Sequence, residues 1–368
     1  MADMKQAVEP LIVKYINSKA AKEKLPVNTT FEITSRCNFN CKMCYVHNSA
    51  CNALKNSELS AKQWIDIAQQ AKDAGALFVL ITGGEPFFKE DFCEIYEAVA
   101  KMGFILSLNT NLSLLNDEIL DLLTKYRPNR VNVSLYGTSN KTYSDLCGVP
   151  AFETVKKNIL RLKECGIRVK VNSSITQYNI GDLDSIMDFC EENNIIFKGT
   201  GYMFPQIRLG EPKSRISARE VSAIRAHIDR RLLSDEDFRE RARRIKAGIE
   251  IAANDECPVD ETEGGAIRCR AGKTSAWIDS RGNLSYCGMI PAGEDCNIPE
   301  KGFAECWKTV KEKAAAVRMP AKCSCCKYKN ICTLCAASQI CEKGDFSTPA
   351  QYVCENAMSM CEEYEKLL

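Results

Sequence analysis

Three cysteines stand close together near the start of the chain, in the segment CNFNCKMCY. Cys37, Cys41 and Cys44 follow a C-x3-C-x2-C spacing. Thiolates are soft ligands, and short cysteine runs of this kind hold iron–sulfur clusters. A four-iron cluster bound by three cysteines keeps one iron without a protein ligand, where a small molecule carrying amino and carboxylate groups can bind. A fourth cysteine could close the cluster instead, and Cys51 is the nearest in sequence.

The composition narrows the chemistry further. The chain has 368 residues with 21 cysteines and only two histidines. Because there are so few histidines, most catalytic sites that pair a nucleophile with a histidine are excluded, and so are zinc sites built on several imidazoles. Cysteines at motif spacing, in a chain without a secretory signal, indicate metal binding rather than disulfides. Chemistry through thiolate-bound metal is therefore expected.

Charge and hydropathy point to a globular enzyme. The formal net charge is +1, with 45% apolar and 26% charged residues, so no broad field favours nucleic acid or an anionic membrane. No apolar run approaches the ~18 residues of a transmembrane helix, and the start of the chain lacks the apolar core of a signal peptide. We expect a cytoplasmic protein with neither a nucleic-acid nor a membrane partner.

Strand and helix patterns alternate along the chain from residue 29 onward. Strand-like runs cover residues 29–34, 77–82, 104–109, 130–135, 168–173 and 195–203, and helical periodicity covers 57–74, 91–101, 117–125, 152–165 and 182–192. Strands alternating with helices of this length predict βαβ units and a parallel sheet. Six such units favour an α/β fold with a partial (β/α)6 barrel, whose ligand-binding loops gather at the carboxyl ends of the strands.

Four regions are expected along the chain. They are an N-terminal helical segment (1–26), the partial barrel (27–210), a charged helical connector (211–256) and a cysteine-rich domain (257–368). The last region holds thirteen of the 21 cysteines among turn residues and short segments. We interpret it as a small domain stabilised by metal.

A second motif, ITGGEP, ends the second predicted strand. Gly83 and Gly84 allow close backbone approach. Exposed backbone carbonyls and the Glu85 side chain can then hold an ammonium group, and Pro86 ends the motif. A lone Gly-Gly pair is ordinarily a turn, but this one comes one βα unit after the cysteine loop. The two motifs together resemble the radical S-adenosylmethionine (SAM) superfamily, and the resemblance covers nearly the whole chain.

That resemblance implies both a cofactor and a reaction. Cys37, Cys41 and Cys44 would bind a [4Fe-4S] cluster that chelates SAM and cleaves it reductively to a 5′-deoxyadenosyl radical. Further residues implied to bind the cofactor or SAM are Tyr45, Gly83, Gly84, Glu85, Pro86, Asn109, Ser134, Asn172, Tyr202 and Met203. Leu112 stands where the superfamily often has a glycine, and Tyr136 where an Asp or His is usual. For single strand-end residues, a capped strand end or a core position is the alternative.

The C-terminal cysteines are similar to the SPASM extension of radical SAM enzymes. The spacing is Cys269-x12-Gly282-x4-Cys287, followed by C-x2-C-x5-C-x2-C from Cys323 to Cys335, and later Cys354. The resemblance implies two auxiliary [4Fe-4S] clusters, an outer one on Cys323, Cys326, Cys332 and Cys354 and an inner one on Cys269, Cys287 and Cys335.

Because of two departures from the SPASM pattern, the ligand set of the inner cluster stays undecided. The last short gap is two residues instead of three, and the fourth inner ligand is either Cys257 or an open iron that binds substrate. The surplus cysteines, interpreted as small buried apolar residues, are Cys296, Cys306, Cys325, Cys341 and Cys361. Structural zinc is the competing reading of this region, but its paired knuckles usually lie ~15–20 residues apart rather than five.

Relatives with SPASM domains mostly modify peptides or proteins. The leading hypothesis is therefore maturation of a ribosomally made peptide by hydrogen abstraction, giving thioether or carbon–carbon crosslinks or an epimerised residue. Gly288, directly after Cys287, counts against formylglycine formation. Expected partners are a precursor peptide and a flavodoxin or ferredoxin donor. The segment before the first strand is too short for a leader-binding domain, so leader recognition is expected to use another surface or protein.

Two other classes of function stay open. One is oxidation or decarboxylation of a small molecule such as a tetrapyrrole or a sugar. The other is a non-catalytic iron–sulfur or zinc scaffold, which leaves the GGEP motif unexplained. No catalytic acid, base or hydrogen donor is assigned.

Overall fold

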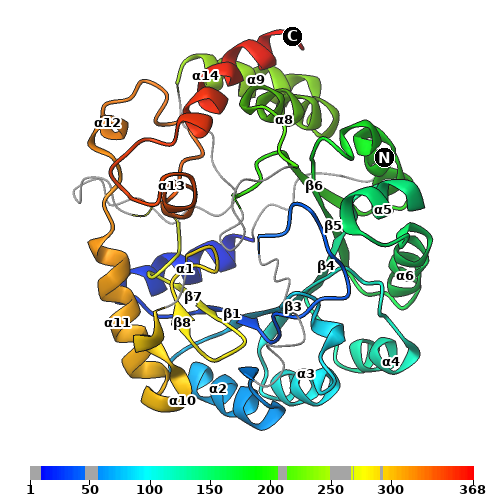
Figure 1. The fold of residues 1–368 in the computed structure, drawn as a ribbon, viewed down its shortest axis with the longest axis vertical. Coiled ribbons are helices and arrows are strands. Elements are labelled where there is room, and N and C mark those ends of the chain that lie inside the picture. Colours follow the sequence, from blue (N-terminus) through cyan, green and yellow to red (C-terminus); the bar gives the residue numbers. More distant parts are fainter. Residues whose placement is uncertain (1–9, 46–56, 206–213, 249–266, 268, 291–292) are drawn as a thin grey trace.

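A computed structural model describes residues 10–45, 57–205, 214–248, 267, 269–290 and 293–368. Its strands form one eight-stranded sheet with the order β6-β5-β4-β3-β2-β1-β7-β8. Figure 1 shows these strands in the middle of the molecule, with helices around them. Among the helices in the described ranges, none combines the length and apolarity that crossing a membrane requires.

The first six strands are parallel and alternate with helices, as the sequence predicts. The strands are β1 (Asn28–Glu32), β2 (Phe78–Thr82), β3 (Ile105–Thr110), β4 (Arg130–Ser134), β5 (Val169–Ser174) and β6 (Ile196–Thr200). The helices after them are α2 (Ala61–Asp73), α3 (Phe92–Lys101), α4 (Asp117–Lys125), α5 (Asn140–Cys147), α6 (Phe152–Glu164) and α7 (Leu183–Glu192). Because β6 and β8 end the sheet without pairing to each other, the barrel is open, and the predicted partial (β/α)6 barrel is confirmed.

The two faces of the sheet differ in chemistry. Side chains facing the helices are apolar and buried; Phe31 of β1, for example, lies with its ring centroid 5.5 Å from that of Trp64 on α2. Positions on the opposite face carry polar residues, including Asn109 and Asn132 at paired positions of β3 and β4. A parallel sheet buried on both faces is normally apolar throughout, so the polar concave face indicates a ligand-facing surface.

The cysteine-rich region adds two strands that the sequence did not predict. β7 (Ser275–Ile278) pairs in parallel with β1, and β8 (Leu284–Ser285) pairs antiparallel with β7. The Trp277 indole donates a hydrogen bond to Glu32 across this join, at 3.0 Å. The region after 257 is thus continuous with the barrel sheet on its β1 side.

Two serines begin helices with a reciprocal capping box. Ser60 caps α2 and forms a reciprocal capping box with Gln63. Ser217 does the same with Glu220 at the start of α8 (Ala218–Leu232) in the connector.

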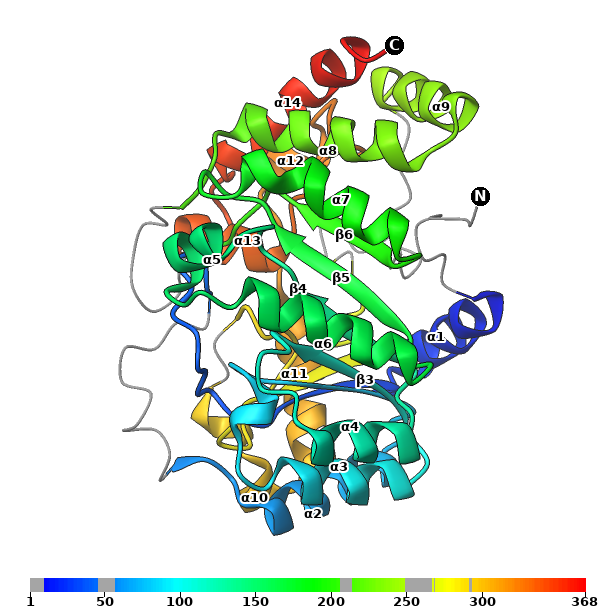
Figure 2. The ribbon, with the colours of Figure 1, turned by 90° about the vertical axis from the view of Figure 1, so that its right-hand side faces the viewer.

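The remaining helices lie outside the six strand–helix units, one before the first strand and the others in the C-terminal half of the chain. They are α1 (Leu11–Glu23), α9 (Asp235–Lys246), α10 (Ile298–Lys301), α11 (Phe303–Ala316), α12 (Ala321–Ser324), α13 (Ala336–Lys343) and α14 (Gln351–Glu365). Figure 2 shows α14 running beside α8 at one end of the molecule. Ser222 of α8 donates a buried hydrogen bond to the Asn356 carbonyl of α14 at 2.6 Å, which joins the connector to the end of the chain.

Candidate active site

The three-cysteine loop follows β1 and is held by the end of α5. The Asn40 amide donates to the Cys147 carbonyl, and the Lys42 amide donates to the Leu146 carbonyl, each at 2.9 Å. The last carbonyls of a helix lack partners within that helix, so α5 offers acceptors that the loop uses. This short helix was missed in the sequence, and it fixes the backbone between Cys37 and Cys44.

The thiols of the loop converge in a buried environment. Burial raises the pKa of Cys37, and the charges of Cys41 and Cys44 raise it further. A hydrogen bond with the thiol of Cys147 raises the pKa of Cys41. The Phe39 amide and the Asn111 side chain donate to the Cys37 sulfur at 3.3 and 3.8 Å. Hydrogen bonds of this kind tune cysteine-bound iron–sulfur clusters.

This arrangement fits a cluster better than a single ion. Within the described ranges, no three potential ligands lie close enough to hold one metal ion. In a four-iron cubane each cysteine binds a different iron, so the sulfurs stand farther apart than around one ion. Buried thiols from one loop, with N–H donors aimed at a sulfur, match that donor set.

The GGEP turn lies directly against this loop. The Gly84 amide donates to the Thr34 carbonyl at 2.8 Å, and the Glu85 amide donates to the Arg36 carbonyl at 2.9 Å. A Cβ at Gly83 would lie 2.6 Å from the Thr34 oxygen, and one at Gly84 would lie 2.3 Å from the Arg36 oxygen. Both glycines are therefore required by backbone approach, and their contact with SAM stays a prediction.

Glu85 is fully buried and joins this turn to the end of β3. Its carboxylate accepts hydrogen bonds from the Thr110 hydroxyl at 2.7 Å, the Asn111 amide at 2.6 Å and the Phe87 amide at 3.1 Å. Desolvation raises the pKa of Glu85 to about 7 in spite of these donors. The side chain thus has a positioning role, and the predicted contact with an ammonium group is untested.

Leu112 adopts a left-handed backbone conformation of the kind that glycine favours. Its φ is 62°, in the left-handed region, and its side chain is fully buried. The Thr110 hydroxyl accepts from the Leu112 amide at 2.8 Å, and the Asn158 side chain donates to the Leu112 carbonyl at 3.0 Å. The left-handed conformation costs about 1–2 kcal/mol, whereas burying a leucine contributes a similar or larger amount.

A buried ion pair between Arg36 and Glu58 supports the chain where it leaves β1. The sequence patterns did not predict this pair. Glu58 accepts from the Thr34 hydroxyl at 2.6 Å, from the Ser35 amide at 3.0 Å and from the Arg36 guanidinium at 3.2 Å. The side chains of Arg36 and Glu58 are only 5% and 2% exposed. Glu90 also accepts from Arg36 at 3.0 Å.

Glu58→Ala is expected to destabilise the protein strongly. Removing one partner of a buried pair strands the other charge, at a cost of about 3–5 kcal/mol. Denaturant unfolding of the reconstituted protein measures this loss, with Glu97→Ala as control because Glu97 pairs with Lys101 on the surface. Equal midpoints for the two variants would show that Glu58 does not support the loop.

Polar strand ends line the concave face beside the cysteine loop. The Asn132 side chain donates to the Asn109 oxygen at 2.8 Å, and Ser134 and Asn172 are direct neighbours across β4 and β5. Within the described part of the chain, the buried side-chain oxygens of Asn172 and Ser173 have no hydrogen-bond partner. A buried acceptor without a partner is costly, so Asn172, which shares the concave face with Ser134, fits a polar ligand. Ser173 points to the opposite, helix-covered face, because side chains alternate along a strand.

Three aromatic side chains connect the loop with other parts of the site. Burial raises the pKa of Tyr136, and the charge of Cys41 adds to the rise, which places this phenol beside the cysteine loop. Burial likewise raises the pKa of Tyr45, with further contributions from Glu32, Cys44 and Cys287. Tyr45 therefore lies within electrostatic reach of both the first cysteine loop and the C-terminal cysteines.

Tyr202 and Met203 have contacts of their own within the protein. The Tyr202 hydroxyl donates to Glu342 of α13 at 2.9 Å, and Arg215 pairs with the same carboxylate. Met203 is 5% exposed and belongs to the main hydrophobic core. Their predicted contact with adenine stays a prediction, and Tyr202 joins the barrel to the cysteine-rich region.

The four cysteines assigned to the outer cluster come together in space. Burial raises the pKa of Cys332, and the charges of Cys354, Cys323 and Cys326 raise it further. Cys326 also raises the pKa of Cys354 on α14. Cys323 lies on α12 and Cys354 on α14, so separate elements contribute to this set.

The inner set is also close together. Burial raises the pKa of Cys287 to about 12, with added contributions from the charges of Cys269, Cys335 and Cys341. The fourth-ligand candidate Cys257, like Cys51 near the first loop, lies outside the described residues. Cys296 and Cys306 are 1% exposed in the main core, so the prediction of small buried apolar residues is confirmed for these two. Cys325, in contrast, is exposed.

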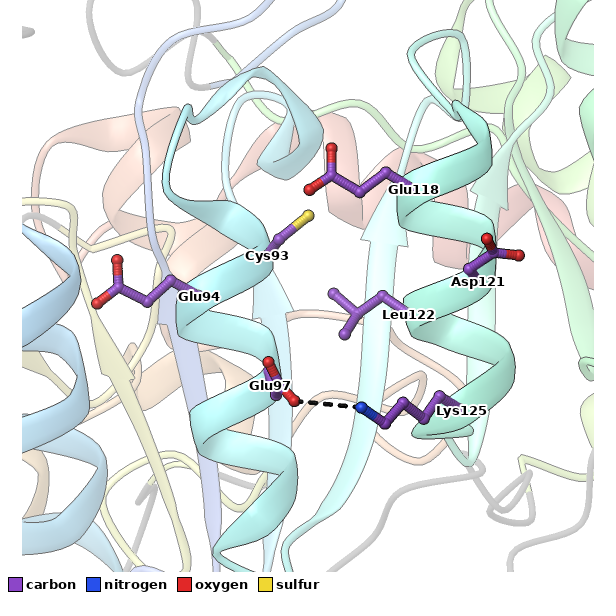
Figure 3. Close-up of a pocket in the computed structure, with 7 residues that line it drawn as sticks. All are labelled: Cys93, Glu94, Glu97, Glu118, Asp121, Leu122 and Lys125. Atoms are coloured by element: carbon purple, nitrogen blue, oxygen red, sulfur yellow. Dashed lines mark ion pairs between the residues drawn. The ribbon is translucent and has the colours of Figure 1, made fainter.

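A separate hollow lies on the helical face, away from these cysteines. Figure 3 shows it between α3 and α4, with Glu97 and Lys125 facing each other across it at 3.6 Å. The other lining residues are Cys93, Glu94, Glu118, Asp121 and Leu122. None of the predicted ligands lines it.

The fold places the three-cysteine loop and the GGEP turn together at the carboxyl edge of an open parallel sheet. Residues 31–190 match the family model described as the Radical SAM superfamily. Over these residues the chain contains a radical SAM domain, and such a domain implies a [4Fe-4S] cluster and SAM.

Similar proteins include heme synthases, probable GTP 3′,8-cyclases and a bacteriocin biosynthesis protein. The AdoMet-dependent heme synthase of Methanosarcina barkeri is 25% identical over 351 residues, covering 90% of this chain and 97% of that protein. The subtilosin biosynthesis protein AlbA of Bacillus subtilis is 32% identical over 161 residues, covering 43% of this chain and 35% of AlbA. Among solved structures, Streptococcus suis SuiB bound to precursor peptide SuiA has a TM-score of 0.68 and 22% identity, covering 92% and 79%. The likeness to SuiB shows the fold alone.

Proposed function

We propose that this radical SAM enzyme carries a SPASM domain with two auxiliary [4Fe-4S] clusters and matures a ribosomally made peptide or protein. The observation that carries the proposal is the gathering of two separate C-terminal cysteine sets in space. Cys323, Cys326, Cys332 and Cys354 form the outer set, and the inner set is centred on Cys287. A single structural zinc would need only one such set.

Different residues hold the first cluster, form the turn beside it and face the ligand. Cys37, Cys41 and Cys44 hold the first cluster, which when bound supplies the electron for cleaving SAM to a 5′-deoxyadenosyl radical. The GGEP turn, fixed by Glu85, presents backbone groups beside it. Asn172 offers a side-chain oxygen that lacks a partner within the described ranges. The radical then removes a hydrogen atom from substrate at this edge of the sheet.

The peptide substrate is supported by the similar proteins. SuiB shares the fold and was solved with its precursor peptide, and AlbA belongs to the biosynthesis of a bacteriocin. The open barrel suits a long substrate, because β6 and β8 do not close the sheet. A flavodoxin or ferredoxin is the expected source of the first electron.

A tetrapyrrole substrate is the second candidate, favoured by a specific observation. The similarity to heme synthases runs from end to end of this chain, whereas that to AlbA covers less than half of it. A porphyrin substrate also needs hydrogen abstraction but no leader peptide.

One experiment separates the two candidates. Anaerobically reconstituted enzyme with SAM and dithionite is incubated with precursor peptides encoded beside its gene, or with Fe-coproporphyrin III. We expect a peptide that loses two hydrogens or exchanges one with solvent, together with 5′-deoxyadenosine, and no change in the porphyrin. Modification of the porphyrin alone would establish the second candidate and overturn the first.

A further inference from the structure

We infer that Cys341 of α13 is the fourth ligand of the inner auxiliary cluster, because its sulfur lies at the loop that carries Cys287 and on the helix that Cys335 begins. The inference rests on the proposed presence of an inner cluster on Cys269, Cys287 and Cys335. It replaces the two alternatives left by the sequence, which are Cys257 or an iron open to substrate.

The position of Cys341 follows from two contacts. Its thiol donates to the Met289 carbonyl, with sulfur and oxygen 3.5 Å apart, and Met289 is two residues beyond Cys287. Cys335 is the N-cap of α13, and its sulfur accepts from the Ser338 amide at 3.3 Å. The helix α13 therefore carries Cys335 at its start and Cys341 further along the same helix.

Electrostatic interactions also link Cys341 with the inner set. The charge of Cys341 contributes to the raised pKa of Cys287, and Cys335 contributes to that of Cys341 after burial. Cys335 acts in the same way on Cys269. By contrast, the surplus Cys306 is influenced by Cys296, which also lies in the main core.

The orientation of α13 is fixed by the residue next to Cys341. Glu342 pairs with Arg215 and accepts from Tyr202, with side chains of Arg215 and Glu342 only 13% and 11% exposed. The Arg215 guanidinium also stacks on Tyr352, 3.9 Å from the ring centroid. Figure 1 shows α13 on the inner side of the segment that carries α12. This buried ion pair holds the helix so that Cys341 faces the Cys287 loop.

A cluster with four protein thiolates has no iron available to a substrate. The inner cluster would then carry electrons away from the radical site rather than bind a substrate thiolate. Tyr45, within electrostatic reach of both Cys44 and Cys287, lies on that route.

The test compares cluster ligation in cysteine variants, independently of any substrate. In a Cys37→Ala/Cys41→Ala/Cys44→Ala background, dithionite-reduced protein is examined by electron paramagnetic resonance with and without cyanide, and iron is counted. Cyanide is expected to leave the parent spectrum unchanged. Cys341→Ala is expected to bind cyanide or to lose about four irons, the content of one cubane. Cys341→Ser keeps a side chain of similar size, and it is expected to alter the spectrum as well. The matched control is Cys325→Ala, which removes an exposed surplus cysteine.

Several outcomes would overturn the inference. They are a cyanide effect in the parent protein, unchanged spectra and iron in both Cys341 variants, or opening of the cluster by Cys257→Ala instead. If the unmodified chain holds only about four irons, the proposed auxiliary clusters fail as a whole. About twelve irons together with inert Cys341 variants would refute the role of Cys341 alone.

Discussion

Replacing Cys37, Cys41 and Cys44 together by alanine is expected to abolish 5′-deoxyadenosine formation and to lower the iron content from about twelve to about eight per chain. The three thiols belong to one loop and influence one another electrostatically. No other described cysteine set lies at the carboxyl end of β1. The loss should therefore remove SAM cleavage entirely and leave the C-terminal clusters filled.

The measurement is iron and sulfide per chain, together with 5′-deoxyadenosine released under dithionite. Cys93→Ala serves as the control, because Cys93 lies on α3 in the hollow of Figure 3, away from the loop. This variant should retain all iron and full SAM cleavage. A parent protein with about four irons that fall to none, and with zinc in the C-terminal region, would remove the auxiliary clusters from the proposal.

The repeated strand-and-helix pattern made the barrel predictable. In each unit, apolar residues such as Val131 and Val133 alternate with polar ones that face the site. The side-chain caps at Ser60 and Ser217 are likewise formed within a few residues. The physical reason is that period and capping are encoded within a few neighbouring residues.

Contacts between distant segments were not predictable in this way. β7 is a four-residue strand whose partner β1 lies far away in sequence, and only the sheet edge makes it a strand. Glu58 gave no sign of its pairing with Arg36, since the two are separated by the cysteine loop. Cys341 was set aside as surplus because it falls outside the spacing pattern, whereas the fold returns it to Cys287 through the Met289 carbonyl.

Glu85 shows why a correct motif does not fix a residue's role. The sequence motif indicates a carboxylate near a ligand's ammonium group. In the structure, both carboxylate oxygens accept hydrogen bonds from Thr110, Asn111 and Phe87. The motif thus also encodes the connection between two neighbouring strand ends, which only the tertiary contacts reveal.

Gly84→Ala is expected to reduce SAM affinity by about 100-fold or more, equivalent to about 3 kcal/mol. An added Cβ would lie 2.3 Å from the Arg36 oxygen, 2.7 Å from the Arg36 carbon and 2.9 Å from the Ser35 oxygen. All three atoms are backbone, so no side chain can rotate away. The turn must move, and this breaks the hydrogen bonds of the Gly84 and Glu85 amides to the loop, each under 3 Å in the structure.

Equilibrium binding of SAM to the reconstituted variant measures this effect, with iron content showing whether the first cluster still assembles. Gly181→Ala is the matched control, because a Cβ there meets nothing within 4 Å, and its affinity should equal that of the parent. Because the clash involves the backbone just before Cys37, we expect the Gly84 variant to lose iron from the first cluster as well as SAM. Unchanged affinity with a full iron content would show that the GGEP turn adapts without disturbing the site, and would remove it from the predicted SAM-binding residues.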